Sequence, residues 1–248
     1  MDNVRKRRLN KTVNKAAQKT VDAADKVKKI GKHAKNLVGD IKRDVEAVRE
    51  RDPAARSNTE VFLLYSGVHA LIAHRIAHKL HENGHFFPAR AISQFAKFMT
   101  GIEIHPGAKI GKGCVIDHGS GVVIGETAQI GDNCTIYQGA TLGGTGKDIG
   151  KRHPTIGNNV MIGAGAKVLG PLYVGDNSKI AANAVVLKEI PDNSTAVGIP
   201  AKIVRREGVK TERDLDQIHI PDPVAQEIKR LEDRIATLEA ELAQKENQ

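Results

Sequence analysis

An aliphatic residue recurs at every sixth position through the centre of this chain. The series falls into three blocks: Ile104, Ile110, Ile116 and Val122; Ile124, Ile130, Ile136 and Leu142; and Ile156, Ile162, Val168, Val174, Ile180 and Val186. A small residue follows most of these positions four places on. Three short strands that turn at small residues make one coil of about 18 residues, and stacked coils bury ladders of like side chains. The period predicts a left-handed parallel β-helix of about four to five coils.

Composition agrees with stacked aliphatic layers. Aromatic residues make up only 3% of the 248 residues, and there are 24 glycines. A conventional core uses more aromatic side chains, whereas a β-helix needs small residues at its corners. Cys114 and Cys134 both occupy the small position of the repeat, so packing explains them better than a catalytic thiol that forms an acyl-enzyme.

The ends of the chain show helical patterns. Residues 46–99 contain apolar residues at helical spacing, and Pro53 in "RDPAAR" predicts a nearby helix start. Near the C-terminus, apolar residues alternate steps of four and three, as in a coiled coil: Val224, Ile228, Leu231, Ile235, Leu238 and Leu242. In parallel pairing Arg234 faces Glu239 favourably, whereas Glu227 faces Glu232 unfavourably.

We therefore expect an α+β chain of four parts. These are a basic helical arm (1–45), an N-terminal helical domain (46–101), the β-helix (102–205), and a linker followed by a coiled-coil helix (206–248).

Positive charge is concentrated in the arm. Residues 1–45 contain 14 Lys and Arg and 5 Asp, a net charge of +9 that equals the formal charge of the whole chain. The arm is either a solvated helix or a contact for nucleic acid or membrane phosphates. It contains no serine and five aspartates, which argues against a transit peptide. Two cysteines, no secretory signal and no apolar run of about 18 residues favour a cytoplasmic protein.

Two interruptions of the repeat point to a functional site. The first is a two-residue slip within "IDHGSGVVIGET", directly after Asp117 and His118. A histidine beside a carboxylate is suited to take a proton from an alcohol, because its unperturbed pKa is near 6.5. The alternative is a surface histidine at a coil corner.

The second interruption is "TLGGTGKDIGKRHPTIG", residues 141–157. The planar guanidinium group of Arg152 can bind both oxygens of a carboxylate, and His153 adds a further hydrogen-bond donor or acceptor. The stretch "GGTGK" does not fit a phosphate-binding loop, because Thr141 stands where that motif needs glycine and Asp148 where it needs Ser or Thr.

Four further histidines lie on one predicted helical face: His74, His78, His81 and His85. Their spacing superficially resembles a metal site. No carboxylate or cysteine on that stripe completes a ligand set, so we prefer packing as the explanation and expect no metal.

Three stretches resemble the serine O-acetyltransferase family: "GIEIHPGAKIGKGCVIDHGSGVVIGETAQIG", "TLGGTGKDIGKRHPTIGNNVMIGAGAKVLG" and "STAVGIPAKIV". Members of this family make O-acetylserine from L-serine and acetyl-CoA for cysteine biosynthesis. The resemblance runs from about Asp44 to Val204, and residues 1–40 match nothing that we recognise. It implies direct acetyl transfer in a ternary complex, with acetyl-CoA as co-substrate and no metal.

The resemblance also implies catalytic roles. His118 matches the general base that deprotonates the serine hydroxyl, and Glu103 stands where the family has the carboxylate that orients this base. Many members have Asp at that position, so the longer Glu103 is a departure. His153 is a further catalytic candidate.

Substrate and cofactor contacts follow from the same resemblance. Asp52 and Asp117 match acids that hold the substrate ammonium, and Arg152 and His153 match the groups that receive its carboxylate. The positions that match the lining of the CoA site are Gly144, Thr145, Ala164, Lys179 and Ala182.

The family's assembly predicts a homotrimer, with each site between neighbouring prisms. A hexamer is the alternative, although the helical region that joins two trimers in longer members is shorter here. Many relatives end in an isoleucine that inserts into O-acetylserine sulfhydrylase; this sequence ends in "KENQ", so we do not expect that complex in its usual form. Three other functions stay open: acetylation of another hydroxyl acceptor, a zinc carbonic anhydrase, and a trimeric scaffold whose arm binds polyanions.

Overall fold

The computed structural model describes residues 31, 35–146, 149–204 and 223–246. The chain divides into two units, residues 1–42 and 43–248, and the site described below lies in the second. The predicted arm falls largely outside the described residues, as does the predicted linker at 206–222. Where the description begins, residues 35–51 form a helix.

Three helices precede the β-helix: α2 (Asn58–Leu64), α3 (Ser66–Glu82) and α4 (Phe86–Thr100). Ser57 caps α2, since its Oγ accepts the Glu60 N–H at 3.1 Å. Gly101 ends α4 in the left-handed conformation, at φ 71°. The helical region was therefore correctly predicted.

The predicted role of Pro53 is wrong. The helix of residues 35–51 ends just before it, and α2 begins only at Asn58. Asp52 instead starts a turn in which its Oδ1 accepts the Ala54 N–H at 2.8 Å. A proline disfavours helical geometry in the residue before it, and Asp favours turns, so Asp-Pro ends a helix here.

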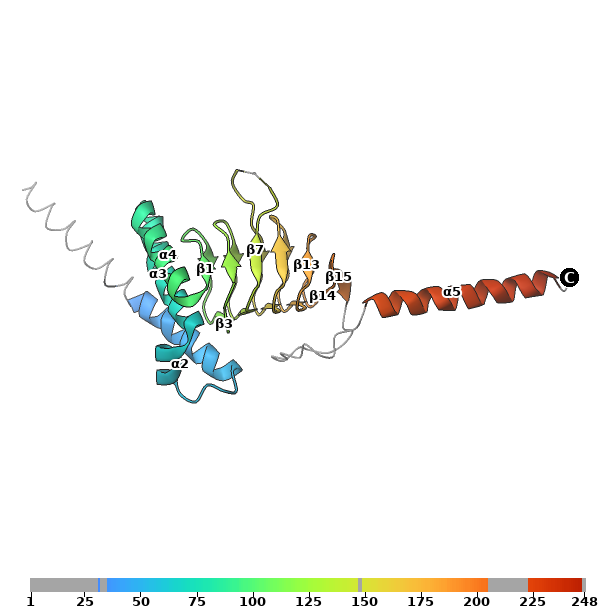
Figure 1. Cartoon of the computed structure of the whole chain (residues 1–248), viewed down its shortest axis with the longest axis horizontal. Coiled ribbons are helices and arrows are strands. Elements are labelled where there is room, and N and C mark those ends of the chain that lie inside the picture. The colour runs from blue at the N-terminus through green and yellow to red at the C-terminus, as the bar shows by residue number, and fades with distance from the viewer. Residues whose placement is uncertain (1–30, 32–34, 147–148, 205–222, 247–248) are drawn as a thin grey trace, which may run out of the picture. The chain divides into compact units, whose positions relative to one another are not determined.

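The repeats form a parallel β-helix, which confirms the main prediction (Figure 1). Sheet A has the order β1-β4-β7-β10-β13, sheet B β11-β8-β5-β2, and sheet C β15-β14-β12-β9-β6-β3, in which only β15 is antiparallel. The strands are β1 (Glu103–Ile104), β2 (Lys109–Ile110), β3 (Val115–Asp117), β4 (Val123–Ile124), β5 (Gln129–Ile130), β6 (Thr135–Tyr137), β7 (Thr141–Gly143), β8 (Thr155–Ile156), β9 (Met161–Ile162), β10 (Lys167–Leu169), β11 (Tyr173–Val174), β12 (Lys179–Ile180), β13 (Val185–Val186), β14 (Thr195–Val197) and β15 (Lys202–Val204).

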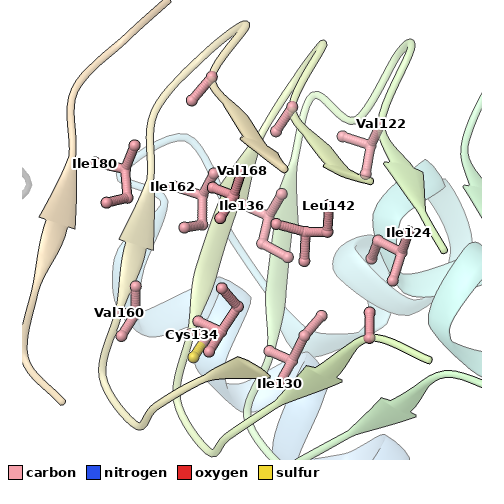
Figure 2. Close-up of a cluster of buried hydrophobic side chains, with 14 of the residues drawn as sticks. Val122, Ile124, Ile130, Cys134, Ile136, Leu142, Val160, Ile162, Val168 and Ile180 are labelled. Carbon is pink, nitrogen blue, oxygen red and sulfur yellow. The ribbon is translucent and has the colours of Figure 1, made fainter. Parts of the chain in front are cut away.

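The recurring aliphatic residues pair with one another from coil to coil. In sheet C, Ile116 pairs with Ile136, and Ile162 pairs with Ile180. Figure 2 shows Ile136, Ile162 and Ile180 pointing into the interior, and all three are buried. Full burial of one such side chain stabilises the fold by about 1.5–3 kcal/mol, so these ladders carry the stability of the β-helix.

Both cysteines belong to this interior. Cys114 and Cys134 are fully buried and form no disulfide. Burial raises the pKa of both thiols, that of Cys134 to about 11. A thiol that stays protonated is a poor nucleophile, which agrees with a packing role.

Left-handed backbone conformations at the corners follow a pattern. Among the described residues, the non-glycine positions with positive φ are five asparagines and His118: Asn133, Asn159, Asn177, Asn183 and Asn193 lie at 54–58°, and His118 at 57°. Asparagine tolerates this conformation better than most residues. His118 therefore holds a corner geometry that asparagine holds elsewhere in the chain.

The C-terminal helix is α5 (Pro223–Glu246). Its predicted seam residues Ile228, Leu231, Ile235 and Leu238 are between 42 and 54% exposed. The helix is thus confirmed, while its pairing into a coiled coil stays a prediction. None of the helices in the described part of the chain is both long and apolar enough to cross a membrane.

A buried histidine on α3 makes stability depend on pH. Burial lowers the pKa of His74 from 6.5 to about 3, so the folded chain keeps this ring neutral. The unfolded chain binds a proton below pH 6.5, so His74 should lower the free energy of unfolding by about 2 kcal/mol between pH 6.5 and 5. Asp44, whose pKa burial raises to about 6, offsets part of this fall in wild type, so the His74 contribution is read as the difference between wild type and variant. In urea titrations at these two values, His74→Leu should remove that slope. The exposed His85→Gln is the control, and an unchanged slope in His74→Leu would contradict the assignment.

Candidate active site

His118 lies in the turn between β3 and β4. The register pairs Ile104 with Ile124 and Ile124 with Leu142, so the first coil is two residues longer than the second. The extra residues widen the corner at His118, whose ring is exposed and makes no hydrogen bond with any described residue. A ring in this state can accept a proton from a bound molecule.

Two of the predicted acids lie near the Tyr65 phenol. Tyr65 Oη donates to Asp52 Oδ2 at 2.9 Å. The pKa of Tyr65 is raised to about 12, first by partial burial, then by the hydrogen bond to Asp52 and by the negative charges of Asp52, Glu60 and Asp117. Asp52 and Asp117 thus both act on one phenol, although they are far apart in sequence. Their carboxylates form an acidic surface that is suited to an ammonium group.

Glu103 has a different environment from the one predicted. Its carboxylate pairs with Lys97 at 2.5 Å and with Arg90 at 3.2 Å. The hydrogen bond from Lys97 is the main cause of its lowered pKa. In the described part of the chain no hydrogen bond joins Glu103 to His118, so its orienting role stays a prediction.

Arg152 and His153 are held by the turn that follows β4. Thr127 Oγ1 accepts the backbone N–H groups of Arg152 at 3.0 Å and His153 at 3.1 Å. The Thr127 N–H donates to His153 Nδ1 at 3.2 Å, which leaves Nε2 to carry the ring proton. Burial, and then the charge of Arg152, lowers the pKa of His153. A neutral Nε2–H donor therefore stands next to a guanidinium group, which forms an ion pair with Glu126.

Gly125 makes room for this histidine. A Cβ at position 125 would lie 2.0 Å from Cδ2 and 2.1 Å from Nε2 of His153. Gly125→Ala should displace the ring, lower turnover and destabilise the fold by about 1–3 kcal/mol. Thermal unfolding and steady-state kinetics measure both effects. Gly39→Ala is the matched control, because no atom lies within 4 Å of a Cβ added there; equal behaviour of the two variants would refute the packing argument.

The predicted residues fall into two groups on opposite edges of sheet A. His118 lies on the edge where chain segments enter from sheet C, and Arg152 lies on the edge where they leave for sheet B. The excursion between β7 and β8 extends beyond the turns of the neighbouring coils (Figure 1). One chain therefore carries the two groups of candidate residues on separate edges of sheet A.

The CoA candidates divide in the same way. Backbone bonds link the His118 edge from coil to coil, from Gly139 N–H to Ser120 O at 2.9 Å and from Asn183 N–H to Ala164 O at 2.7 Å. Ala164 and Ala182 continue this edge, whereas Gly144 and Thr145 stand at the foot of the excursion. Lys179 lies apart from both groups, buried on β12 of sheet C.

Three contributors were missed by sequence reasoning. Glu126 and Thr127 stand in "VVIGET", directly after the slip, so the interruption was a signal for them. Tyr65 ends an apolar helical stretch and had no such signal. In the described residues no group of three or more His, Cys, Asp or Glu side chains is placed to hold a metal ion.

Comparisons with known proteins identify the family. The profile described as "Serine acetyltransferase, N-terminal" matches residues 5–73, so the likeness begins well before Asp44 and corrects the expectation that residues 1–40 match nothing. The profile "Bacterial transferase hexapeptide (six repeats)" matches residues 153–188. The serine acetyltransferase of Bacillus licheniformis is 57% identical over 208 residues, which are 84% of this chain and 96% of that protein.

Solved structures agree with this result. The serine acetyltransferase of Neisseria gonorrhoeae has a TM-score of 0.69 and 42% identity, covering 74% of this chain and 70% of that one. The soybean serine acetyltransferase complexed with serine has a TM-score of 0.67 and 46% identity, covering 68% and 69%. The chain is a transferase that belongs to the serine acetyltransferase family.

Proposed function

We propose that this chain transfers the acetyl group of acetyl-CoA to the hydroxyl of L-serine, giving O-acetyl-L-serine for cysteine biosynthesis. The observation that carries the proposal is the unpartnered His118 ring beside the acidic surface of Asp52 and Asp117. A base next to an ammonium site fits an amino acid that carries a hydroxyl group. The soybean relative in complex with serine supports this choice of substrate.

The reaction needs no covalent enzyme intermediate. His118 takes the proton of the serine hydroxyl as its oxygen attacks the thioester carbonyl carbon of acetyl-CoA. The tetrahedral intermediate then collapses, the carbon–sulfur bond breaks, and the imidazolium returns the proton to the leaving thiolate. Positioning of the two substrates supplies much of the rate, because a serine hydroxyl is a poor nucleophile at neutral pH. In this scheme the negative charge of Glu103 stabilises the imidazolium that forms on His118.

A second copy of the chain completes the site. His118 and Arg152 lie on opposite edges of sheet A, so one chain does not bring them to the same substrate. In a homotrimer the Arg152 edge of one prism meets the His118 edge of the next, and a cyclic assembly repeats this contact three times. Asp52 and Asp117 then hold the ammonium of serine, while Arg152 and His153 of the neighbour hold its carboxylate.

Acetyl-CoA binds along the same groove between prisms. Ala164 and Ala182 follow His118 along the same edge, and their small side chains leave room for the pantetheine arm. Gly144 and Thr145 line the opposite edge. Lys179, the fifth candidate from the resemblance, lies buried on β12 outside this groove.

Thiol release from acetyl-CoA, measured with L-serine and a panel of other hydroxyl acceptors, tests the reaction. We expect L-serine to be the preferred acceptor by a wide margin. A preference for a sugar or another alcohol would refute the serine assignment, and no turnover with any acceptor would favour the scaffold function.

A further inference from the structure

The junction between α2 and α3 is fixed to the end of strand β3. Gly67 approaches Ile116 so closely that a Cβ would lie 2.0 Å from the Ile116 carbonyl oxygen. Ser66 Oγ donates to the His118 carbonyl oxygen at 3.4 Å. Only glycine allows the first contact, so the helical region has a set position relative to the catalytic corner.

Tyr65 directly precedes Ser66 in this junction. Its hydroxyl group contacts the carboxylate of Asp52, which lies outside any helix or strand. Asp52 lies in the turn between the helix of residues 35–51 and α2. Its Oδ1 accepts the Ala54 N–H at 2.8 Å, and its Oδ2 accepts the Tyr65 O–H at 2.9 Å. Each oxygen has one fixed donor, so the carboxylate has one orientation while lone pairs remain for a ligand.

The phenol acts as a donor at any physiological pH. Partial burial, the hydrogen bond to Asp52 and the nearby charges of Glu60 and Asp117 together raise the pKa of Tyr65 to about 12. A protonated phenol among three carboxylates donates its single proton to one of them. That acceptor is Asp52, which leaves Asp117 without a side-chain hydrogen bond among the described residues.

We propose that Tyr65 is a positioning residue that holds the Asp52 carboxylate beside Asp117, so that both acids meet one substrate ammonium. This inference rests on the proposed function and adds a residue to it. Tyr65 binds Asp52, and the junction that carries Tyr65 is fixed to strand β3, which bears Asp117 and leads into the turn of His118. Without the phenol, Asp52 keeps its charge and loses its fixed orientation, which weakens the binding of the ammonium group.

Tyr65→Phe tests the role, because it removes one oxygen and keeps the ring. We expect the Kd and the KM for L-serine to rise about tenfold, with kcat within twofold of wild type and the KM for acetyl-CoA unchanged. Calorimetry with L-serine gives the Kd without any turnover. Tyr173→Phe is the matched control, since Tyr173 is exposed on the last strand of sheet B and should leave all four constants unchanged.

A double-mutant cycle with Asp52→Asn separates positioning from a general structural effect. If Tyr65 acts through Asp52, Tyr65→Phe should change the Kd by less than twofold in the Asp52→Asn background. A tenfold change in both backgrounds, or an unchanged Kd in Tyr65→Phe alone, would overturn the inference. If wild-type protein binds L-serine without turnover, the proposed reaction is refuted, but the comparison of Kd values still tests the role of Tyr65. If wild-type protein does not bind L-serine, both the proposed reaction and the role of Tyr65 are overturned.

Discussion

Replacing His118 with asparagine should lower kcat by about 10²–10⁴-fold, the usual contribution of a positioned general base. Asparagine is the informative substitution because five asparagines adopt the same left-handed corner conformation in this chain. His118→Asn therefore removes the base and keeps the turn, whereas alanine at φ 57° would add backbone strain. The variant should bind L-serine with a Kd close to that of wild type.

Thiol release at saturating L-serine and acetyl-CoA measures this effect. Thermal unfolding should be unchanged in His118→Asn, which shows that the loss comes from chemistry and not from the fold. Full turnover in a correctly folded His118→Asn would exclude His118 as the base. A stable acetyl-enzyme formed from acetyl-CoA without serine would exclude direct transfer.

The second large effect concerns the serine carboxylate. Arg152→Ala should raise the KM for L-serine about 10–100-fold, since hydrogen bonds to charged groups contribute about 1.5–3 kcal/mol each and 1.4 kcal/mol corresponds to a factor of ten. Arg152→Lys should fall between wild type and alanine, because an ammonium group keeps the charge and loses the planar fork. The KM for acetyl-CoA should change little.

Lys188→Ala is the control for the loss of a positive charge, because Lys188 is exposed on the last coil. An unchanged KM for L-serine in Arg152→Ala would refute the binding of the serine carboxylate by Arg152 and favour another acceptor. Mixing the two variant chains tests the shared site, with L-serine held near the wild-type KM so that each variant alone turns over slowly. In a cyclic trimer that contains both His118→Asn and Arg152→Ala chains, one site in three has both residues intact, so about a third of wild-type activity should return. No recovery in mixed trimers would place both residues in the same chain's site.

Much of the fold could be predicted from the period alone. Ile116, Ile136 and Ile162 stack in register because an aliphatic residue recurs on the same face of successive coils, and a slip of one residue within a strand would turn it away from the interior. The helical region was less accessible. Pro53 is compatible with a helix start and with a turn after a helix, and only packing selects between them.

The candidate site was predicted unevenly for a physical reason. His118 and Arg152 stand at interruptions of a regular repeat, and interruptions are visible in a sequence. Tyr65 and Gly125 act through single contacts between residues that are distant in the chain, to Asp52 in one case and to the His153 ring in the other. Contacts of this kind leave no periodic trace.

The sequence by itself determined the β-helix, the corner that bears His118 and the excursion that bears Arg152, because a six-residue period and its breaks are properties of local chain geometry. The tertiary structure alone decided which groups meet. It bonded the Tyr65 phenol to Asp52, paired Glu103 with Lys97 and Arg90, and placed His118 and Arg152 on opposite edges of sheet A. The contacts of Asp52 and Glu103 depend on how the helices pack around the first coils, and the two edges depend on the order in which the chain visits the three sheets. A six-residue period specifies neither the contacts between distant side chains nor the direction of the coil.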